Sequence, residues 1–157
     1  AGRPRPLLDD KVLTDWNGLM MAALARAAQT FDEPTYADAA RLCADFLLNT
    51  MRDGDGRLLH RFGGGTAGIF ANADDHAFLA MGLFDLYEAT HEPPYLAESL
   101  RLTEEMVSHF WDDGDGGFFF TPDDGEELIT RRKEIYDGAV PSGNSTAAGL
   151  MLRLGRP

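Results

Sequence analysis

Apolar residues occupy nearly every helical position in two stretches of the chain, residues 16–31 and residues 76–89. In the later turns of the first stretch, Arg26 and Gln29 are the only strongly polar residues. A helix that is apolar on all sides is surrounded by protein. We therefore predict two buried inner helices over these ranges.

Each of these stretches is followed by one in which apolar residues recur on a single helical face. The apolar positions are Tyr36, Ala40, Cys43 and Leu47 in residues 35–51, and Leu102, Met106 and Phe110 in residues 95–111. This one-sided pattern is typical of an outer helix that covers a buried one. The connections are short and contain Pro34 in one case and Pro93 in the other, which fits the first turn of a new helix. Short connections make each pair of helices antiparallel.

The pattern repeats along the chain. Tyr36 corresponds to Tyr95, 59 positions later, and the Asp-Gly-Asp-Gly turn that begins at Asp53 recurs at Asp113, 60 positions later. Residues 145–154 then begin a third inner helix. We predict an all-α fold of tandem antiparallel helical hairpins in one domain over 1–157, with hairpin 1 at about 15–52, hairpin 2 at about 74–111 and the start of hairpin 3 at about 143–154. An open solenoid and a closed ring of hairpins both fit this pattern.

The segments that connect one hairpin to the next, which we call returns, are predicted to contain short β-structure. Each Gly- and Asp-rich turn leads into a strand-like segment, and the longer return, residues 113–141, contains GGFFFTP followed by ELITRR. Strand-like runs separated by a turn predict a β-hairpin there. Residues 145–154 have no outer helix to cover them, so we also expect exposed apolar surface and self-association through this truncated third hairpin.

The acidic composition narrows the range of partners. The formal net charge is −12 over 157 residues, and the acidic residues are scattered. Nucleic acids and anionic membranes both require a basic surface, so we expect neither as a partner. The single cysteine forms no disulfide within the chain, the N-terminal AGRPRP lacks the apolar run of a signal peptide, and no apolar segment is long enough to span a bilayer. These features favour a reducing, cytoplasmic location.

Polar residues gather where the inner helices begin, in the segments 14–18, 72–76 and 137–145. Parallel inner helices place these segments at one end of the molecule, and the returns that carry His60, Arg61 and Tyr136 open onto the same end. Helix N-termini favour carboxylates, phosphates and hydroxyl groups, which predicts a small-molecule site there. Asp, Ser and Asn are also preferred helix N-caps, so a purely structural role for each segment stays open.

For a sugar or a similar polyol, these side chains suggest distinct roles. Carboxylate catalysis on sugars requires two acids on opposite sides of a bond, and different helices supply candidates for them. His76 is predicted to relay a proton or to orient a carboxylate, and Trp16 or Tyr136 to stack on the ligand. The predicted catalytic residues are Asp75, Asp137 and His76, and the predicted ligand-binding residues are Asp15, Trp16, Asn17, Asp74, Tyr136, Ser142 and Asn144.

Motifs for metals and cofactors are missing from the sequence. The Asp-Gly-Asp-Gly turns place Leu58 and Phe118 where an EF-hand loop requires glycine, so they are predicted to be tight turns. The 4 histidines have no paired zinc spacing, and no phosphate-binding Gly-x-x-x-x-Gly-Lys is present. Ser142 lies outside a Gly-x-Ser-x-Gly elbow, and Cys43 is predicted to be a core thiol. We expect no metal and no cofactor.

Three motifs together resemble the C-terminal region of a thioredoxin-domain-containing family that includes spermatogenesis-associated protein 20. They are LDDKVLTDWNGLMMAALA, ADDHAFLAMGLFDLYEAT and the segment from FWDDGDGG to YDGAVPSGNS, and the resemblance covers nearly the whole chain. It implies an (α/α)6 toroid similar to N-acylglucosamine 2-epimerases and six-hairpin glycosidases, with the pocket at the starts of the inner helices. It supplies no reaction. A carbohydrate-directed enzyme domain and a non-catalytic ligand- or protein-binding module both remain open.

Overall fold

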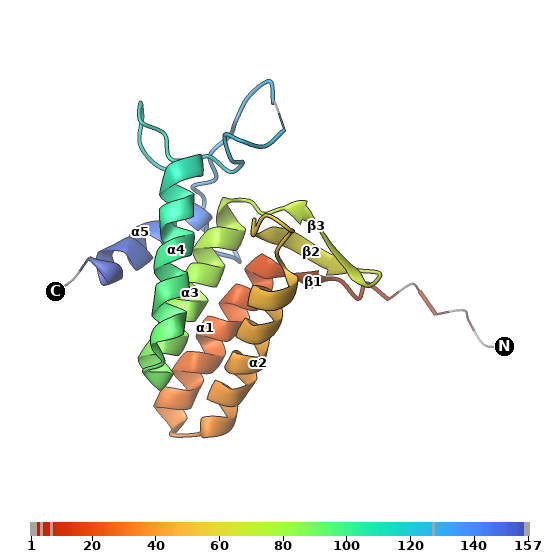
Figure 1. The fold of residues 1–157 in the computed structure, drawn as a ribbon, viewed down its shortest axis with the longest axis vertical. Helices are drawn as coiled ribbons and strands as arrows, with labels where there is room; N and C mark the ends of the chain where they lie inside the picture. The colour runs from red at the N-terminus through yellow and green to blue at the C-terminus, as the bar shows by residue number, and fades with distance from the viewer. Residues whose placement is uncertain (1–2, 4, 7, 127, 156–157) are drawn as a thin grey trace.

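The computed structural model describes residues 3, 5–6, 8–126 and 128–155, so part of the polar N-terminal segment lies outside the described residues. The helices are α1 (Thr14–Phe31), α2 (Pro34–Thr50), α3 (Ala73–Thr90), α4 (Pro93–Phe110) and α5 (Gly143–Leu154). α1 and α2 form one antiparallel hairpin, α3 and α4 form the next, and α5 begins beside α3 (Figure 1). The predicted order of inner and outer helices is confirmed.

The two hairpins turn in the same way. Each inner helix ends at a residue in the left-handed region, Asp32 with φ 53° after α1 and His91 with φ 57° after α3. Each outer helix then begins with proline, Pro34 or Pro93, which has no N–H to leave unpaired in the first turn. The repeat in the sequence is therefore a repeat in backbone conformation.

α3 is the central helix of the described chain, with α1, α4 and α5 packed around it. Its backbone approaches that of α1 closely at two glycines. A Cβ atom on Gly82 would lie 2.6 Å from the carbonyl oxygen of Gly18, and one on Gly18 would lie 2.6 Å from the backbone nitrogen of Leu79. Glycine is required at both positions because any side chain would enter the backbone of the neighbouring helix.

The core has two parts, and both include residues of α3. The larger part draws on all five helices and includes Met21, Leu47 and Leu83, all without exposed surface. The other joins α3, α4 and α5 and includes Phe78, Met106 and Ala147. The three inner helices are also tied by the buried carboxylate of Asp85, which pairs with Arg26 of α1 and Arg153 of α5.

α1 is less enclosed than the sequence predicts, whereas α5 exposes apolar surface as expected. Trp16, Met20 and Phe31 of α1 are exposed, although the sequence predicts that protein surrounds this helix. On α5, Leu150 is buried against the core, whereas Leu152 is 68% exposed. These side chains lie on helix faces that no described element of the chain covers.

The first return, between α2 and α3, contains the strands β2 (Leu59–Gly63) and β3 (Thr66–Phe70). They form an antiparallel sheet in the order β1–β2–β3 with β1 (Val12–Leu13), which precedes α1. Val12 pairs with Phe62, and Leu59 pairs with Phe70. The expected β-hairpin of the second return is not formed. Its described residues contain no strand; their backbone contacts include a bridge between Trp111 and Phe118 and a hydrogen bond of 2.7 Å from Phe120 to Arg132.

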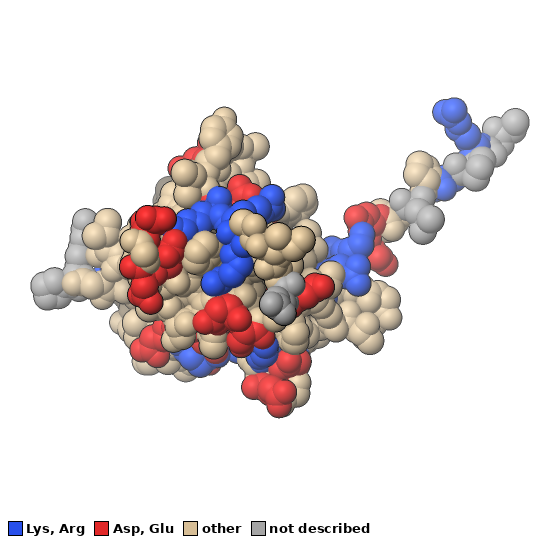
Figure 2. Space-filling view, turned by 90° about the horizontal axis from the view of Figure 1, so that it is seen from above, with Lys and Arg blue, Asp and Glu red and all other residues tan. Residues whose placement is uncertain are grey.

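Viewed from the end where the inner helices begin, Lys and Arg side chains gather in a central band with Asp and Glu on its flanks (Figure 2). This mixed face agrees with the scattered charge of the sequence. Within the described residues, no helix combines the length and apolar character that crossing a membrane requires.

Candidate functional site at the starts of the inner helices

The three inner helices begin next to one another and are joined by aspartate side chains. The backbone N–H of Asp15, in the first turn of α1, donates to Oδ1 of Asp75 at 3.0 Å. The backbone N–H of Gly143, at the start of α5, donates to Oδ1 of Asp74 at 3.0 Å. Two adjacent residues of α3 therefore bind the first turns of the helices on either side, as a parallel arrangement of inner helices requires.

Asp75 is the most deeply buried carboxylate of this region, with no exposed surface. Besides Asp15 it accepts the backbone N–H of Asn72 at 2.9 Å and closes a capping box at the start of α3. Its two oxygens also lie 2.9 and 3.0 Å from Nδ1 of His60. Because a buried carboxylate is stable only when its lone pairs are satisfied, this set of donors explains why the charge is tolerated here.

His60 lies on β2 and was missing from the residues predicted for the site. The strand is tied to α1 because the hydroxyl of Thr14 donates to the carbonyl of Leu59 at 2.6 Å. Since Nδ1 of His60 donates to the Asp75 carboxylate, Nε2 is the ring nitrogen left for a ligand. The hydrogen bond to Asp75 raises the pKa of His60, and 24% of the side chain is exposed.

Asp15 completes the cluster around His60. Its carboxylate is half-buried, and burial, followed by the neighbouring charge of Asp75, raises its pKa. Ligand atoms of Asp15, His60 and Asp75 all lie within 4.8 Å of one another. We call these three residues the Asp15–His60–Asp75 cluster. Asp75 already accepts several hydrogen bonds, and Nδ1 of His60 donates one of them. Few atoms of the cluster are therefore free to coordinate a metal ion.

Asp74, Asn144 and Ser142 hold the second return and α5 in place. Burial raises the pKa of Asp74, and its bond from Gly143 opposes that shift. The side-chain amide of Asn144 donates to the carbonyls of Phe118 and Glu134 at 2.9 and 2.8 Å, and its oxygen accepts the Phe118 N–H at 2.7 Å. Ser142 caps α5 by accepting the N–H of Ser145.

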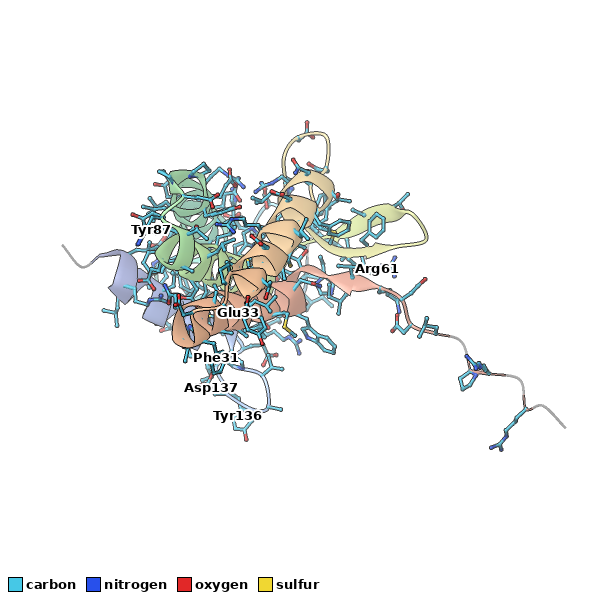
Figure 3. The ribbon with its side chains drawn as sticks, turned by 90° about the horizontal axis from the view of Figure 1, so that it is seen from below. Phe31, Glu33, Arg61, Tyr87, Tyr136 and Asp137 are labelled. Carbon is cyan, nitrogen blue, oxygen red and sulfur yellow. The ribbon has the colours of Figure 1, made fainter. Side chains whose placement is uncertain are left out.

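Asp137 and Tyr136 lie on a loop that projects beyond the helices (Figure 3). Asp137 accepts the N–H of Ser142 at 2.8 Å and the hydroxyl of Ser145, and these bonds lower its pKa. Tyr136 is 82% exposed, and Trp16, beside Asp15 on α1, is 62% exposed. Both rings are accessible to a ligand. Asn17 instead donates to the carbonyl of Leu13 at 2.8 Å and secures the first turn of α1.

The structure separates His76 from the Asp15–His60–Asp75 cluster. Its Nδ1 donates to the carbonyl of Asn72 at 2.9 Å, and its ring packs against Phe110 with centroids 4.9 Å apart. Adjacent residues on a helix point about 100° apart, so Asp75 faces α1 while His76 faces α4. The half-buried thiol of Cys43 lies near Asn17, and burial raises its pKa.

Comparison with known proteins shows sequence relatives over almost the entire chain. It is 37% identical to human and to mouse spermatogenesis-associated protein 20 over 97% of its length, and 34% identical to an uncharacterised protein of Caenorhabditis elegans. The chain spans about a fifth of the length of these relatives, 21% of the human protein. No protein-family model matches it.

The solved structures that the chain resembles include an epimerase and glycoside hydrolases. The chain superimposes on cellobiose 2-epimerase from Spirochaeta thermophila with a TM-score of 0.72 at 15% identity, covering 94% of this chain and 39% of that one. A family 105 glycoside hydrolase of C. acetobutylicum gives a TM-score of 0.72 at 16% identity, covering 95% of this chain and 45% of that one. These likenesses establish the α/α-toroid fold, and the resemblance to the spermatogenesis-associated protein 20 family expected from the sequence is confirmed.

Proposed function

From a chain related to spermatogenesis-associated protein 20 and folded as part of an α/α toroid, we infer a role in acid–base chemistry on a carbohydrate or similar polyol. The observation that carries this proposal is the contact between Nδ1 of His60 and the fully buried carboxylate of Asp75. A carboxylate that holds one ring nitrogen fixes the orientation of the imidazole and leaves the other nitrogen to exchange protons with a ligand.

The geometry favours proton transfer by His60 over hydrolysis by two carboxylates. Glycoside hydrolysis uses two carboxyl groups about 5–9.5 Å apart with the sugar between them. Ligand atoms of Asp15 and Asp75 lie within 4.8 Å of each other, and Asp75 has no exposed surface from which to reach a substrate. Asp75 therefore acts as a positioning residue, whereas His60 and Asp15 would contact the ligand.

The remaining side chains fit a polyol ligand. Burial and the neighbouring charge of Asp75 raise the pKa of Asp15, which favours the protonated form of this carboxyl group more than in an exposed aspartate. Trp16 and Tyr136 expose aromatic faces at the same end of the molecule. The solved structures with this fold include proteins named as a D-mannose isomerase, a cellobiose 2-epimerase and a mannosidase, whose substrates are sugars. Isomerisation and epimerisation are proton-transfer reactions, and in this proposal His60 transfers the proton.

A non-catalytic binding module is the second candidate, and a specific set of contacts favours it. Asn72 and Ser142 cap helices, Asp74 and Asp75 bind the starts of neighbouring helices, and Asn144 holds the second return. Each of these residues has a structural hydrogen bond that would be present without a substrate. In this case His60 binds a ligand without exchanging a carbon-bound proton.

Two measurements on the chain distinguish these candidates. Titration of the ¹⁵N-labelled chain with D-mannose and with cellobiose is expected to shift the Nε2 resonance of His60, and His60→Gln is expected to abolish sugar binding. In D₂O, proton transfer is expected to introduce deuterium at carbon 2 of the sugar, and His60→Gln to slow this exchange by about 10²-fold or more. His91→Gln, in the exposed turn between α3 and α4, is the matched control. Sugar binding without deuterium exchange favours the binding module, and absence of any sugar-dependent shift at His60 contradicts both.

A further inference from the structure

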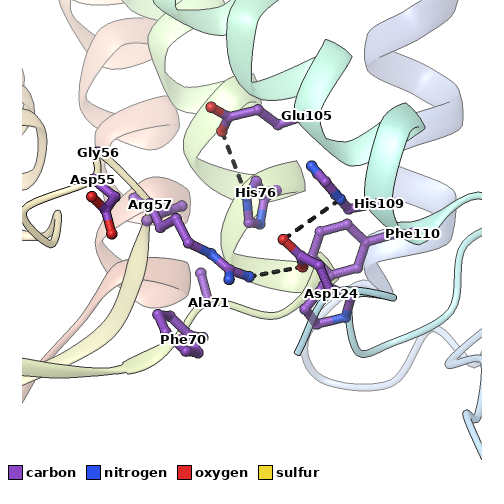
Figure 4. A pocket seen from close by; sticks show the side chains of 12 residues that line it. Asp55, Gly56, Arg57, Phe70, Ala71, His76, Glu105, His109, Phe110 and Asp124 are labelled. Carbon is purple, nitrogen blue, oxygen red and sulfur yellow. Dashed lines mark hydrogen bonds and ion pairs between the residues drawn. The ribbon is translucent and has the colours of Figure 1, made fainter. Parts of the chain in front are cut away.

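A pocket lies away from the Asp15–His60–Asp75 cluster, between the segment that connects α2 to α3, the start of α3 and the end of α4. Its volume is about 130 Å³, well above the roughly 10–15 Å³ that a single water molecule requires. We call it the outer pocket (Figure 4). Its lining includes Arg57 and Phe70 of the first return, His76 of α3, and Glu105, His109 and Phe110 of α4.

His76 presents a free lone pair to the outer pocket. Because Nδ1 contacts the carbonyl of Asn72, which only accepts, the hydrogen of the neutral ring lies on Nδ1. Only 7% of the residue is exposed, and burial lowers its pKa, so the ring is neutral near neutral pH. Nε2 therefore carries a lone pair, and no described residue donates a hydrogen bond to it.

Glu105 presents a second free acceptor to the same space. Arg101 binds Oε1 of this side chain, which leaves Oε2 facing His76 (Figure 4). Oε2 lies 3.9 Å from Nε2 of His76, beyond hydrogen-bond distance. Two acceptors at this separation can both lie about 2.8 Å from one nitrogen that donates a hydrogen to each.

The same separation disfavours a zinc ion. Zinc bonds to imidazole nitrogen and carboxylate oxygen at about 2.1 Å. An ion at that distance from both atoms would subtend an angle of about 135° between them, wider than the tetrahedral angle that zinc adopts in proteins. A ligand with N–H donors fits these two atoms without movement of either side chain.

The guanidinium that lines the outer pocket is paired with a carboxylate, and the lining carries more carboxylates than guanidinium groups. Arg57 donates to Asp124 at 2.8 Å and lies over the ring of Phe70, 4.2 Å from its centroid. Nδ1 of His109 lies 3.0 Å from Asp123. Asp55, Glu105 and Asp124 line the pocket against the single guanidinium of Arg57. Nε2 of His76 and Oε2 of Glu105 are available as acceptors, and the excess of carboxylates in the lining favours a cation.

We propose that the outer pocket binds the ammonium group of a small organic amine between Nε2 of His76 and Oε2 of Glu105. The N–H groups donate to these two atoms, and the aromatic ring of Phe110 offers an apolar wall for the carbon attached to the ammonium. This binding is independent of the function proposed for the Asp15–His60–Asp75 cluster, because it uses neither His60 nor Asp75.

Ethylammonium chloride is the probe, and the long-range ¹H–¹⁵N spectrum of the chain is the measurement. We expect a saturable shift of the His76 Nε2 resonance with a Kd on the order of a millimolar, near the limit for a ligand of three non-hydrogen atoms. Glu105→Gln is expected to weaken binding by about tenfold or more, because the charged acceptor is lost. Glu104→Gln removes an exposed carboxylate from the neighbouring position of α4 and is expected to leave the affinity unchanged. Thermal unfolding of both variants verifies that they are folded.

Three results would overturn the proposal. The first is the absence of a saturable shift at His76 with ethylammonium. The second is an equal response to ethanol, which would show a pocket for neutral donors. The third is saturable binding of zinc chloride at His76 and Glu105 without binding of ethylammonium, which would show a metal site.

Discussion

The backbone N–H of Asp15 binds the buried carboxylate of Asp75 at 3.0 Å, across 60 residues of sequence. This bond joins the first turns of two successive inner helices. The adjacent Asp74 makes the corresponding bond to Gly143 of the third inner helix, 69 residues away. A pair of neighbouring aspartates thus places three helix starts around one region, and β2 brings His60 to the same carboxylate.

The His60–Asp75 contact predicts a pH-dependent contribution to stability. Because the pKa of His60 is raised in the folded chain, this contribution is complete below the unfolded value of about 6.5 and is lost as pH rises through the folded pKa. We expect His60→Gln to lower the free energy of unfolding more at pH 5.5 than at pH 8.5. Urea unfolding at both pH values measures the difference. In an Asp75→Asn background the effect of His60→Gln should no longer depend on pH, and a persisting dependence would assign it to another partner.

The close approach of α1 and α3 predicts that alanine lowers the stability of the chain at Gly82 but not at Gly149. Gly82→Ala places a methyl group 2.6 Å from the carbonyl oxygen of Gly18 and is expected to lower the free energy of unfolding by about 1–3 kcal/mol or more. Gly149 of α5 has no atom within 4 Å of a built Cβ. Gly149→Ala is the matched control and is expected to stabilise the chain by up to about 1 kcal/mol, since alanine favours helix. Chemical denaturation compares the two, and equal effects would contradict the helix packing described here.

Asp85 provides a test of the contacts that join the inner helices near their C-terminal ends. It is 2% exposed and pairs with Arg26 and Arg153. Asp85→Asn is expected to cost about 2 kcal/mol, as the loss of hydrogen bonds to a charged group does. Glu88, which is 46% exposed and also pairs with Arg153, supplies the control variant Glu88→Gln. That variant is expected to cost less than about 0.5 kcal/mol because exposed ion pairs contribute little.

Asn144 is predicted to control the order of the second return. Its side chain makes three hydrogen bonds to the backbone of residues 118 and 134. Asn144→Ala is expected to raise hydrogen exchange of the Phe118 amide by about tenfold, which corresponds to one lost hydrogen bond. Ser145→Ala removes the neighbouring hydroxyl and should leave that amide unchanged. Unchanged exchange in Asn144→Ala would show that other contacts hold the loop.

The exposed face of α5 leads us to propose self-association of the chain. Leu152 is 68% exposed on a helix whose opposite face is packed on α3. We expect sedimentation equilibrium to detect dimers or larger species, and Leu152→Glu to shift the equilibrium towards the monomer. Leu42→Glu on α2, where Leu42 is 72% exposed, is the control for a change of charge elsewhere. A wild-type chain that is monomeric at high concentration would contradict the proposal.

The periodic features of the fold were predictable from the sequence, because they depend on local patterns. Alternating inner and outer helices, proline at the start of α2 and α4, and tight Gly-Asp turns all follow from residues close together in the chain. The exposure of Trp16 and Met20 was not predicted, since it depends on which helix face has a neighbour. The second return contains strand-like residues, but Asn144 and other side-chain contacts hold it instead of a ladder of backbone bonds.

The location of the candidate site was predictable from the sequence, but only some of the residues that form it were. The sequence placed Asp15 and Asp75 at the same end, which the direct bond between them confirms. The sequence did not indicate that His60, and not His76, would contact Asp75. That contact depends on the register between β2 and β1 and on the hydrogen bond from the Thr14 hydroxyl to β2. His76 follows Asp75 directly in sequence, yet the helical turn directs it to the outer pocket. The roles predicted for Asp137, Tyr136 and the other site residues stay predictions.

The tautomer and pKa of His60 test the central claim most directly, and both are read from long-range ¹H–¹⁵N spectra recorded across a pH titration. If the converging helix starts hold His60 against a buried carboxylate, the neutral ring carries its hydrogen on Nδ1, its pKa lies above about 6.5, and Asp75→Asn lowers that pKa. A ring protonated on Nε2, with a pKa at or below the ordinary value and no response to Asp75→Asn, would contradict the account.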